Sequence, residues 1–158
     1  MTEYALNISD EIAYARKWAL SRNPAYYSFN NIGGDCTNFI SQCLFAGGAV
    51  MNYTRDTGWY YNSLYDRAAA WTGVHYFYRF IVNNERVGPF GEVVDIHYAR
   101  PGDVVQLGVG TFHHTVFVTA MRNGIPYVCA HTADALDVPL TAYQFDRIRC
   151  LRIDRARR

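Results

Sequence analysis

The hydrophobic pattern of this sequence changes near residue 92, and that change limits the folds that the chain can adopt. In the first part, apolar residues recur at helical spacing; in the run from Val74 to Ile81 they fall at positions i, i+3, i+4 and i+7. In the second part, the sequence alternates as strands do, most clearly from His114 to Met121. Helices followed by neighbouring strands predict an α+β fold.

Size and composition indicate one globular domain. The chain has 158 residues, of which 50% are hydrophobic, so it can bury one proper core but hardly two. We therefore expect a single domain over residues 1–158, with a core at 8–153 and a solvated basic tail at 154–158. The formal net charge of +1 argues against a nucleic-acid partner.

The sequence contains no predicted membrane span or secretion signal. No apolar run approaches the ~20 residues that a spanning helix needs, and the start, Met1 to Tyr4, lacks the charged and apolar regions of a signal peptide. We expect a soluble protein with no membrane partner. Its compartment stays open, because a secreted or cell-wall-associated role follows if a leader has been removed.

Capping residues and helix breakers predict where the helices begin and end. The first helix is expected to start with Ser9 as its N-cap. The second should run from Cys36 to about Ala46, where Gly47-Gly48 permits a left-handed stop. A third helix is expected after Thr72 as N-cap, and residues 83–92 then have the composition of a surface loop.

The second helix begins with residue types that favour a reactive thiol. The run Gly33-Gly34-Asp35-Cys36 delivers a cysteine to the first turn, where unpaired amides and the positive end of the helix dipole stabilise a thiolate. The competing interpretation is a buried core thiol, which is what most free cysteines are. Asp35 should raise the pKa of this thiol unless it points away or caps the helix, and we expect it to cap.

A β-hairpin is expected to bring two histidines together. The strands 114–121 and 125–131 flank a tight turn at Asn123-Gly124. His114 and His131 should therefore come near one another at the open end of the hairpin.

Two kinds of chemistry compete at that end of the hairpin. If the start of the Cys36 helix packs there, a thiol, an imidazole and an orienting group meet. His113 and His114 are adjacent on a strand, so only one of them can face the thiol, and His114 is the better candidate. Alternatively, Cys129 and His131 lie on one strand face and could join them around zinc. The spacing matches no standard zinc signature, so we expect no metal and no other cofactor.

Several blocks of the sequence follow one another in a specific order: Gly34-Asp35-Cys36-Thr37-Asn38-Phe39-Ile40-Ser41-Gln42-Cys43, Gly47-Gly48, Trp59-Tyr60-Tyr61, Pro101-Gly102-Asp103-Val104-Val105, His114-Thr115-Val116-Phe117-Val118 and His131-Thr132-Ala133-Asp134. Together they resemble the bacterial putative amidase domain family, which is similar to the NlpC-type and CHAP-type papain-like cysteine peptidases. The resemblance covers most of the chain, from about Tyr14 to Arg152. It implies a papain-like arrangement, in which N-terminal helices carrying the cysteine pack on an antiparallel sheet carrying the histidine.

The resemblance also implies a role for each site residue. Matched position by position, Cys36 is the nucleophile and His114 the base. His131 takes the place of the third, orienting residue, with Asp134 as the fallback for that role. In this mechanism a thiolate and imidazolium pair attacks an amide carbonyl, and water then cleaves the resulting thioester.

The developing oxyanion needs fixed hydrogen-bond donors. The backbone amide of Cys36 is the natural first donor. For the second donor, Asn30 is spaced like the glutamine of papain-type enzymes, and Asn31 or Tyr27 are the alternatives.

These residues predict a cysteine-dependent amidase or peptidase that hydrolyses an amide bond. We expect a peptide or other amide substrate, including peptidoglycan, and a monomeric protein. Trp59 and Tyr60, with Tyr61, offer stacking surfaces for a peptide or sugar. An acyl transfer to an amine would use the same site. The alternative is a non-catalytic module that binds a peptide or glycan on the same fold.

Overall fold

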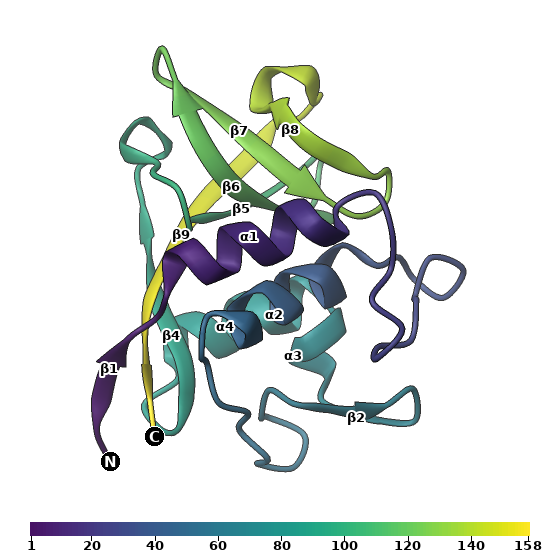
Figure 1. Cartoon of the computed structure of the whole chain (residues 1–158), viewed down its shortest axis with the longest axis vertical. Coiled ribbons are helices and arrows are strands. Elements are labelled where there is room, and N and C mark those ends of the chain that lie inside the picture. The colour runs from purple at the N-terminus through teal and green to yellow at the C-terminus, as the bar shows by residue number, and fades with distance from the viewer.

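The computed structural model describes every residue from 1 to 158 (Figure 1). Its four helices and nine strands follow one another as β1 (Glu3–Ala5), α1 (Ile8–Trp18), α2 (Cys36–Ala46), β2 (Tyr61–Ser63), β3 (Asp66–Arg67), α3 (Ala69–Thr72), α4 (Val74–Asn83), β4 (Gly88–Val94), β5 (Val104–Gly108), β6 (His114–Arg122), β7 (Ile125–Ala130), β8 (Ala135–Pro139) and β9 (Arg147–Arg157). The helices precede most of the strands, so the predicted α+β class is confirmed.

One curled antiparallel sheet organises the molecule. Its strands run in the order β1-β9-β5-β6-β7-β8, and β4 pairs with β9 as the seventh strand. The long β9 connects the sheet, because it pairs with β1, β4 and β5. In Figure 1, α1 and α2 lie across the sheet, while β6, β7 and β8 curl away above them.

The sheet separates two hydrophobic cores. On one face, the four helices bury large side chains against it, among them Phe39 and Phe77, which meet Phe117 of β6. On the other face, strands β5 to β8 enclose a second cluster, to which Val116 and Val118 belong. Strand alternation explains why neighbours on β6 belong to different cores. Burying one such side chain contributes about 1.5–3 kcal/mol to the free energy of unfolding.

The first helix begins two residues earlier than the sequence predicted. Its N-cap is Asn7, whose side-chain oxygen accepts a hydrogen bond from the backbone N–H of Asp10 at 3.1 Å. Ser9 therefore lies inside α1, and the expected Ser9 cap was wrong. Asparagine and serine cap equally well, so the sequence alone did not decide between them.

The later helices confirm two predicted boundaries and correct one. Helix α2 runs from Cys36 to Ala46 and ends at two glycines, of which Gly48 has the left-handed φ of 102°. Helix α4 begins at Val74 with Gly73 as its N-cap. Thr72 is the last residue of α3 and caps nothing. No helix is both long and apolar enough to cross a membrane.

Residues 88–94, most of which were expected to form a surface loop, form β4 along β9. The left-handed φ of 105° at Gly88 turns the chain into this strand. The expected loop was wrong because Gly88-Pro89, which is typical of a turn, here begins a strand that is held by its pairing with β9.

The predicted basic tail at 154–158 is also wrong. Strand β9 extends to Arg157 and pairs with β1, so that Ala156 is fully buried. The arginines around it have defined partners: Arg155 and Arg157 form ion pairs with Glu3 at 3.4 and 3.2 Å. Strand pairing across the whole chain, which local charge cannot reveal, makes this segment part of the sheet. The ordered sheet therefore extends beyond the 8–153 core at both ends.

Candidate active site

Cys36 is the first residue of α2, as the sequence predicted. Gly33 and Gly34, with φ of 80° and 98°, form the left-handed turn that leads into it. The backbone N–H groups of Cys36, Thr37 and Asn38 have no backbone acceptor. Cys36 is 7% exposed, so this thiol is largely buried at the positive end of the helix.

The thiol lies against the beginning of β6. The Thr37 hydroxyl is 3.8 Å from the sulfur. Burial raises the pKa of Cys36 above its ordinary value; hydrogen bonds from the Thr115 backbone, from the Thr37 hydroxyl and from the Thr37 backbone oppose this, and the charge of Asp35 adds to it. Cys36 is therefore a protonated thiol at neutral pH in the free protein.

His114, the candidate base, is the first residue of β6 and is 8% exposed. Its ring lies 5.7 Å from that of Tyr143, centroid to centroid, and makes no hydrogen bond within the protein. Burial, helped by the neighbouring His113, lowers the pKa of His114 to about 4. Its imidazole is therefore neutral at neutral pH, and no protein group forms a hydrogen bond with either ring nitrogen.

Strand alternation separates the side chains of His114 and Thr115. The Thr115 hydroxyl faces α2, where it lies 3.1 Å from the Thr37 hydroxyl. His114 pairs with Leu107 and leans toward the cluster enclosed by the strands. The thiol thus reaches the backbone beside His114, but no hydrogen bond joins Cys36 to the imidazole. With a protonated thiol and a neutral ring, the expected resting thiolate and imidazolium pair is not present.

His131 lies directly after β7 and is held by two short hydrogen bonds. Nδ1 is 2.6 Å from Oδ2 of Asp35, and Nε2 is 2.7 Å from the carbonyl oxygen of Trp18. Its ring stacks on Phe39 at 4.0 Å, and only 1% of the residue is exposed. Because neither nitrogen is bonded to His114, the structure does not bring His131 into the orienting position that the resemblance implied.

These contacts fix the protonation of the Asp35–His131 pair. A carbonyl oxygen only accepts, so Nε2 of His131 carries a proton. The Asp35 carboxylate also accepts from the backbone of Phe29 at 2.8 Å and from Asn38 at 2.9 Å. Although burial acts to raise the pKa of Asp35, these hydrogen bonds and that from His131 lower it. Asp35 is therefore a buried carboxylate, and its Oδ2 faces Nδ1 of His131.

Asp35 thus does not have the role expected of it. It occupies the N-cap position of α2, but its side chain makes no capping hydrogen bond to the helix backbone. The predicted cap was wrong because the carboxylate is taken up by Phe29, Asn38 and His131, which local sequence does not reveal.

Arg22, which the sequence did not single out, organises the polar groups beside this pair. Its guanidinium binds Asp134 at 2.9 and 3.0 Å and the side-chain oxygen of Asn30 at 3.0 Å. Asp134 is therefore committed to Arg22 and makes no hydrogen bond to His114. The Thr132 hydroxyl donates to the same Asn30 oxygen at 3.1 Å and accepts the backbone N–H of Asp35 at 3.2 Å. This places Asn30 next to the start of α2, with its amide nitrogen free.

Of the two predicted stacking residues, only Tyr60 is accessible. Trp59 is fully buried, donates to the Ser41 hydroxyl at 2.9 Å and packs on Trp71 at 4.5 Å. It forms part of the core, so its predicted role in binding substrate was wrong. The half-exposed Tyr60 lies 5.2 Å from Tyr53, centroid to centroid.

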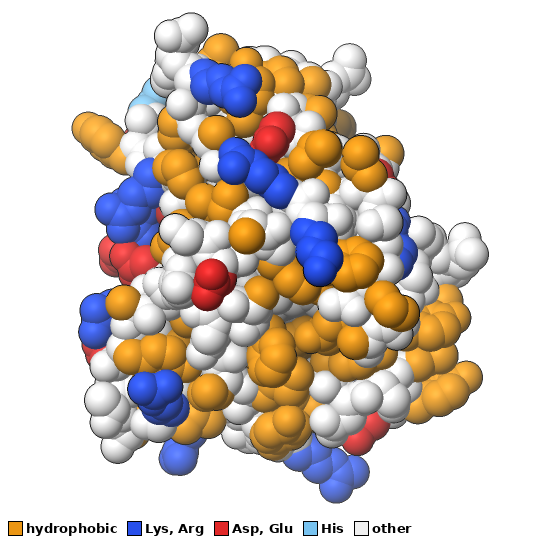
Figure 2. Space-filling model, in the orientation of Figure 1, with side chains coloured by type: hydrophobic (Ala, Val, Ile, Leu, Met, Phe, Trp, Pro, Cys, Tyr) orange, Lys and Arg blue, Asp and Glu red, His pale blue; other side chains and the backbone are white.

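Exposed apolar side chains occur near the chain that leads into α2. They include Tyr27, which is 42% exposed, and Ile32, which is 49% exposed. Figure 2 shows hydrophobic side chains gathered on the right of the molecule, where Figure 1 has the α1–α2 connection and β2. This is the apolar surface closest in the chain to Cys36.

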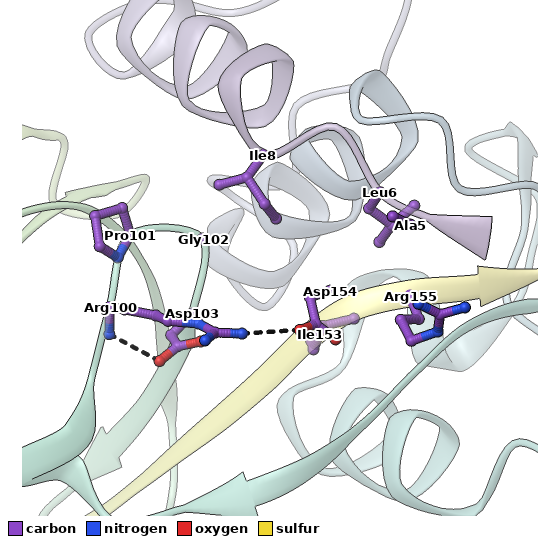
Figure 3. Close-up of a pocket in the computed structure, with 10 residues that line it drawn as sticks. All are labelled: Ala5, Leu6, Ile8, Arg100, Pro101, Gly102, Asp103, Ile153, Asp154 and Arg155. Atoms are coloured by element: carbon purple, nitrogen blue, oxygen red, sulfur yellow. Dashed lines mark hydrogen bonds and ion pairs between the residues drawn. The ribbon is translucent and has the colours of Figure 1, made fainter.

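Two cavities lie elsewhere in the molecule. One of about 290 Å³, drawn in Figure 3, lies between β1, the start of α1 and β9. Its charged side chains are paired within the protein, as in the 2.8 Å contact of Arg100 with Asp154. A wider one of about 820 Å³ lies along α4 and residues 52–58. Neither is lined by Cys36 or His114.

The four cysteines are free thiols, and no group of three or more His, Cys, Asp or Glu side chains is arranged to hold a metal ion. Cys129, the proposed zinc partner of His131, instead lies 3.8 Å from Asp137.

One comparison with known proteins identifies a family. The sequence profile of the putative amidase domain matches residues 5–153. An uncharacterized protein of Bacillus subtilis, YhbB, is 37% identical over 130 residues, which cover 78% of this chain and 40% of that protein. The chain thus spans less than half the length of this curated relative. No solved structure matches the sequence.

Proposed function

This chain belongs to the putative amidase domain family, and from that membership, which suggests amide hydrolysis, we propose that it is a cysteine-dependent amidase or peptidase acting through a thioester. The observation that supports the cysteine mechanism most is the position of Cys36. Its thiol lies at the start of α2, beside unpaired backbone N–H groups and the strand that begins with His114.

In this proposal Cys36 is the nucleophile and His114 the general base. The pKa of Cys36 is raised and that of His114 is about 4, so the resting groups are a thiol and a neutral imidazole. The proton therefore leaves the sulfur for His114 as the sulfur attacks the amide carbonyl. His114 then returns this proton to the leaving amine, and water cleaves the thioester with His114 again as base.

The imidazole has to approach the thiol for this step. No hydrogen bond joins Cys36 to His114 in the free protein, and catalytic hydrogen bonds often form fully only with substrate bound. His114 has no hydrogen-bond partner to lose, and the aromatic ring paired with its own is that of Tyr143. Because strand alternation aims the ring away from α2, we expect substrate binding to rearrange the start of β6 so that the ring reaches the sulfur.

The oxyanion donors follow from the start of α2. The backbone N–H of Cys36 is unpaired and is the first donor. Asn30 is the proposed second donor, because Arg22 and Thr132 hold its oxygen and leave its amide nitrogen free.

A role for His131 follows from its contacts. It holds the carboxylate of Asp35, whose charge raises the pKa of the adjacent thiol. We therefore assign His131 to positioning the start of α2, in place of orienting His114.

The proposed substrate is a peptide or other amide, including peptide material of the bacterial cell wall. Tyr60 and the exposed Tyr27 are the candidate stacking residues. The second candidate is a non-catalytic module that binds a peptide or glycan. The raised pKa of Cys36 and the absence of a hydrogen bond between Cys36 and His114 are the observations that favour it.

The test is amine release from a panel of short peptides, N-acyl amides and purified peptidoglycan. The proposal predicts release by the wild-type protein and none above background by Cys36→Ser, whose fold should be intact. Release that survives in Cys36→Ser would contradict the cysteine mechanism. Saturable binding of a panel member without turnover, unchanged in Cys36→Ser, would favour the binding module.

A further inference from the structure

A continuous row of polar side chains leads from β9 to the Cys36 sulfur, and the proposed reaction does not yet account for it. It begins at Arg149 on β9, crosses Gln106 on β5 and Thr115 on β6, and reaches Cys36 through Thr37. The successive distances are 2.6, 3.4, 3.1 and 3.8 Å. Every member except Arg149 is buried.

Arg149 determines how the Gln106 amide is oriented. Its guanidinium carbon lies 3.5 Å and 3.9 Å from the ring centroids of Tyr78 and Phe112, which hold it between them. Its Nε and Nη2 lie 2.9 and 2.6 Å from Oε1 of Gln106. Because arginine only donates, the oxygen of Gln106 must face it. The amide nitrogen then faces the other way, where it donates to the Val74 carbonyl at 2.9 Å.

One assignment of the remaining hydrogen bonds carries this orientation on to the thiol. The second hydrogen of the Gln106 amide points to the Thr115 hydroxyl oxygen, which therefore accepts. The Thr115 hydrogen is then available to the Thr37 oxygen, the other polar atom beside it. That leaves the Thr37 hydrogen for the Cys36 sulfur. The orientation fixed at Arg149 thus reaches the thiol as a hydroxyl donor.

We propose that Arg149, Gln106, Thr115 and Thr37 form a directed hydrogen-bond chain that presents a hydroxyl donor to Cys36 and stabilises its thiolate. Of the four side chains only that of Thr37 contacts the sulfur, and the other three side chains act by positioning it, while the Thr115 backbone bonds the sulfur separately. The inference rests on the proposed role of Cys36 as nucleophile. It identifies one of the groups that lower the pKa of Cys36 against the effect of burial. Cooperative polarisation along the hydrogen-bond chain strengthens the bond from Thr37 to the sulfur.

Four other charged or titratable groups lie around the start of α2 and β6, and of these Asp35 raises the pKa of the thiol. Asp35 precedes it on α2, and His131 and Arg22 lie against the Asp35 carboxylate. His114 precedes Thr115 on β6. None of them belongs to the chain, so variants of the chain leave them unchanged and report on the hydroxyl donor itself.

The test is the rate of iodoacetamide alkylation of Cys36 in the intact protein as a function of pH, located by mass spectrometry. Thr37→Val removes the donor and should raise the apparent pKa of Cys36 by about one unit, so that alkylation at lower pH slows about tenfold. Thr37→Ser keeps a hydroxyl and should restore the wild-type profile. Thr115→Val should shift the pKa in the same direction by less, since Thr37 keeps its hydrogen but loses the bond that orients it.

A double-mutant cycle decides whether Thr115 acts through Thr37. In the Thr37→Val background, Thr115→Val should have no further effect on the alkylation pKa. Equal shifts of Thr115→Val in both backgrounds, or a Thr37→Val profile that matches wild type, would overturn the chain. If Thr37→Val does not fold, Gln106→Glu replaces the donor to Thr115 by an acceptor and should raise the pKa; no change there also overturns the chain.

Failure of this inference is distinguishable from failure of the proposed function. Unchanged alkylation profiles in a protein that still needs Cys36 for amine release would contradict the hydrogen-bond chain but not the proposed function. Amine release that survives Cys36→Ser would remove the nucleophile, whatever the alkylation profiles show.

Discussion

The two buried histidines near the start of α2 have opposite surroundings. His131 is 1% exposed and both of its nitrogens are bonded, to Asp35 and to the Trp18 carbonyl. His114 is 8% exposed and neither of its nitrogens has a partner. The first is held between a carboxylate and a carbonyl oxygen, while burial lowers the pKa of the second to about 4.

This difference assigns the histidines to different tasks. A group whose hydrogen bonds are complete contributes to the arrangement of the fold, and cannot transfer a proton without breaking them. A neutral imidazole with free nitrogens can accept a proton as soon as a donor approaches. The comparison therefore favours His114 for chemistry and His131 for positioning Asp35 beside Cys36.

The largest expected effect is on activity and belongs to His114. His114→Gln should lower kcat/KM for amine release by about 10²–10⁴-fold, because it removes the general base. The melting temperature should hardly change, since the ring has no hydrogen bond to lose. His113→Gln, at the neighbouring position, is the matched control and should keep its activity. A His114→Gln protein that is as active as this control would show that His114 is not the general base.

Replacing His131 should chiefly affect stability. His131→Leu removes the 2.6 Å contact to the buried Asp35 carboxylate and leaves Arg22, at 3.5 Å, as its remaining charged neighbour; it should cost about 3 kcal/mol in the free energy of unfolding. Urea unfolding of the variant and of His75→Leu, an exposed control, measures it. A variant that keeps full stability but loses turnover would return His131 to the orienting role that the resemblance implied.

Acid should lower the free energy of unfolding through the protonation of His114. Burial depresses the folded pKa of His114 to about 4, below the ~6.5 of an unfolded histidine, so the unfolded state binds more protons between these values. The stability from keeping His114 neutral is complete above pH ~6.5 and lost as the pH falls to about 4, a change of about 3 kcal/mol.

Asp35 titrates in a different window. Its pKa is lowered in the folded protein, so its contribution is present above the unfolded value of ~3.9 and is lost only at more acidic pH. Urea unfolding of wild type and His114→Gln at pH 7, 5 and 4 should therefore show a smaller loss in the variant. Parallel losses in both proteins would show that another group titrates there.

The smallest expected effect concerns Arg22. Arg22→Met frees Asp134 and Asn30 at a half-buried site and should cost about 1 kcal/mol of unfolding free energy. The more exposed Arg16 pair with Asp137 provides the control, and Arg16→Met should cost less. If Asn30 is the second oxyanion donor, Arg22→Met should also lower kcat more than it raises KM. An unchanged kcat would remove Asn30 from that role.

The sequence predicted the elements whose signals are local. Helix α2 with its glycine stop and the hairpin turn at Asn123-Gly124, where both residues have positive φ, were predicted correctly from a few neighbouring residues each. The likeness of the residue blocks to an amidase family also agrees with the profile match over residues 5–153.

The errors concern partners that are distant in the chain. Asp35 and His131 are 96 residues apart, and Arg22 and Asp134 are 112 apart, so no local pattern reveals that they meet. Trp59 was mistaken for a binding residue because an aromatic cluster has the same composition in a core as on a surface. The basic end of the chain was mistaken for a tail because its pairing partner lies at the opposite terminus.

The most direct measurement for the central claim is iodoacetamide alkylation of the native protein across pH, for wild type and His114→Gln. Cys43, Cys129 and Cys150 are fully buried, so Cys36 should be the sole fast site. Its rate should rise with an apparent pKa above the ~8.5 of a free thiol, in line with its burial, and should hardly change without His114, because no hydrogen bond joins the imidazole to the thiol in the free protein. A Cys36 that labels no faster than Cys129 and Cys150 would contradict an available nucleophile, and a rate that falls without His114 would contradict the separation of the two side chains in the free protein.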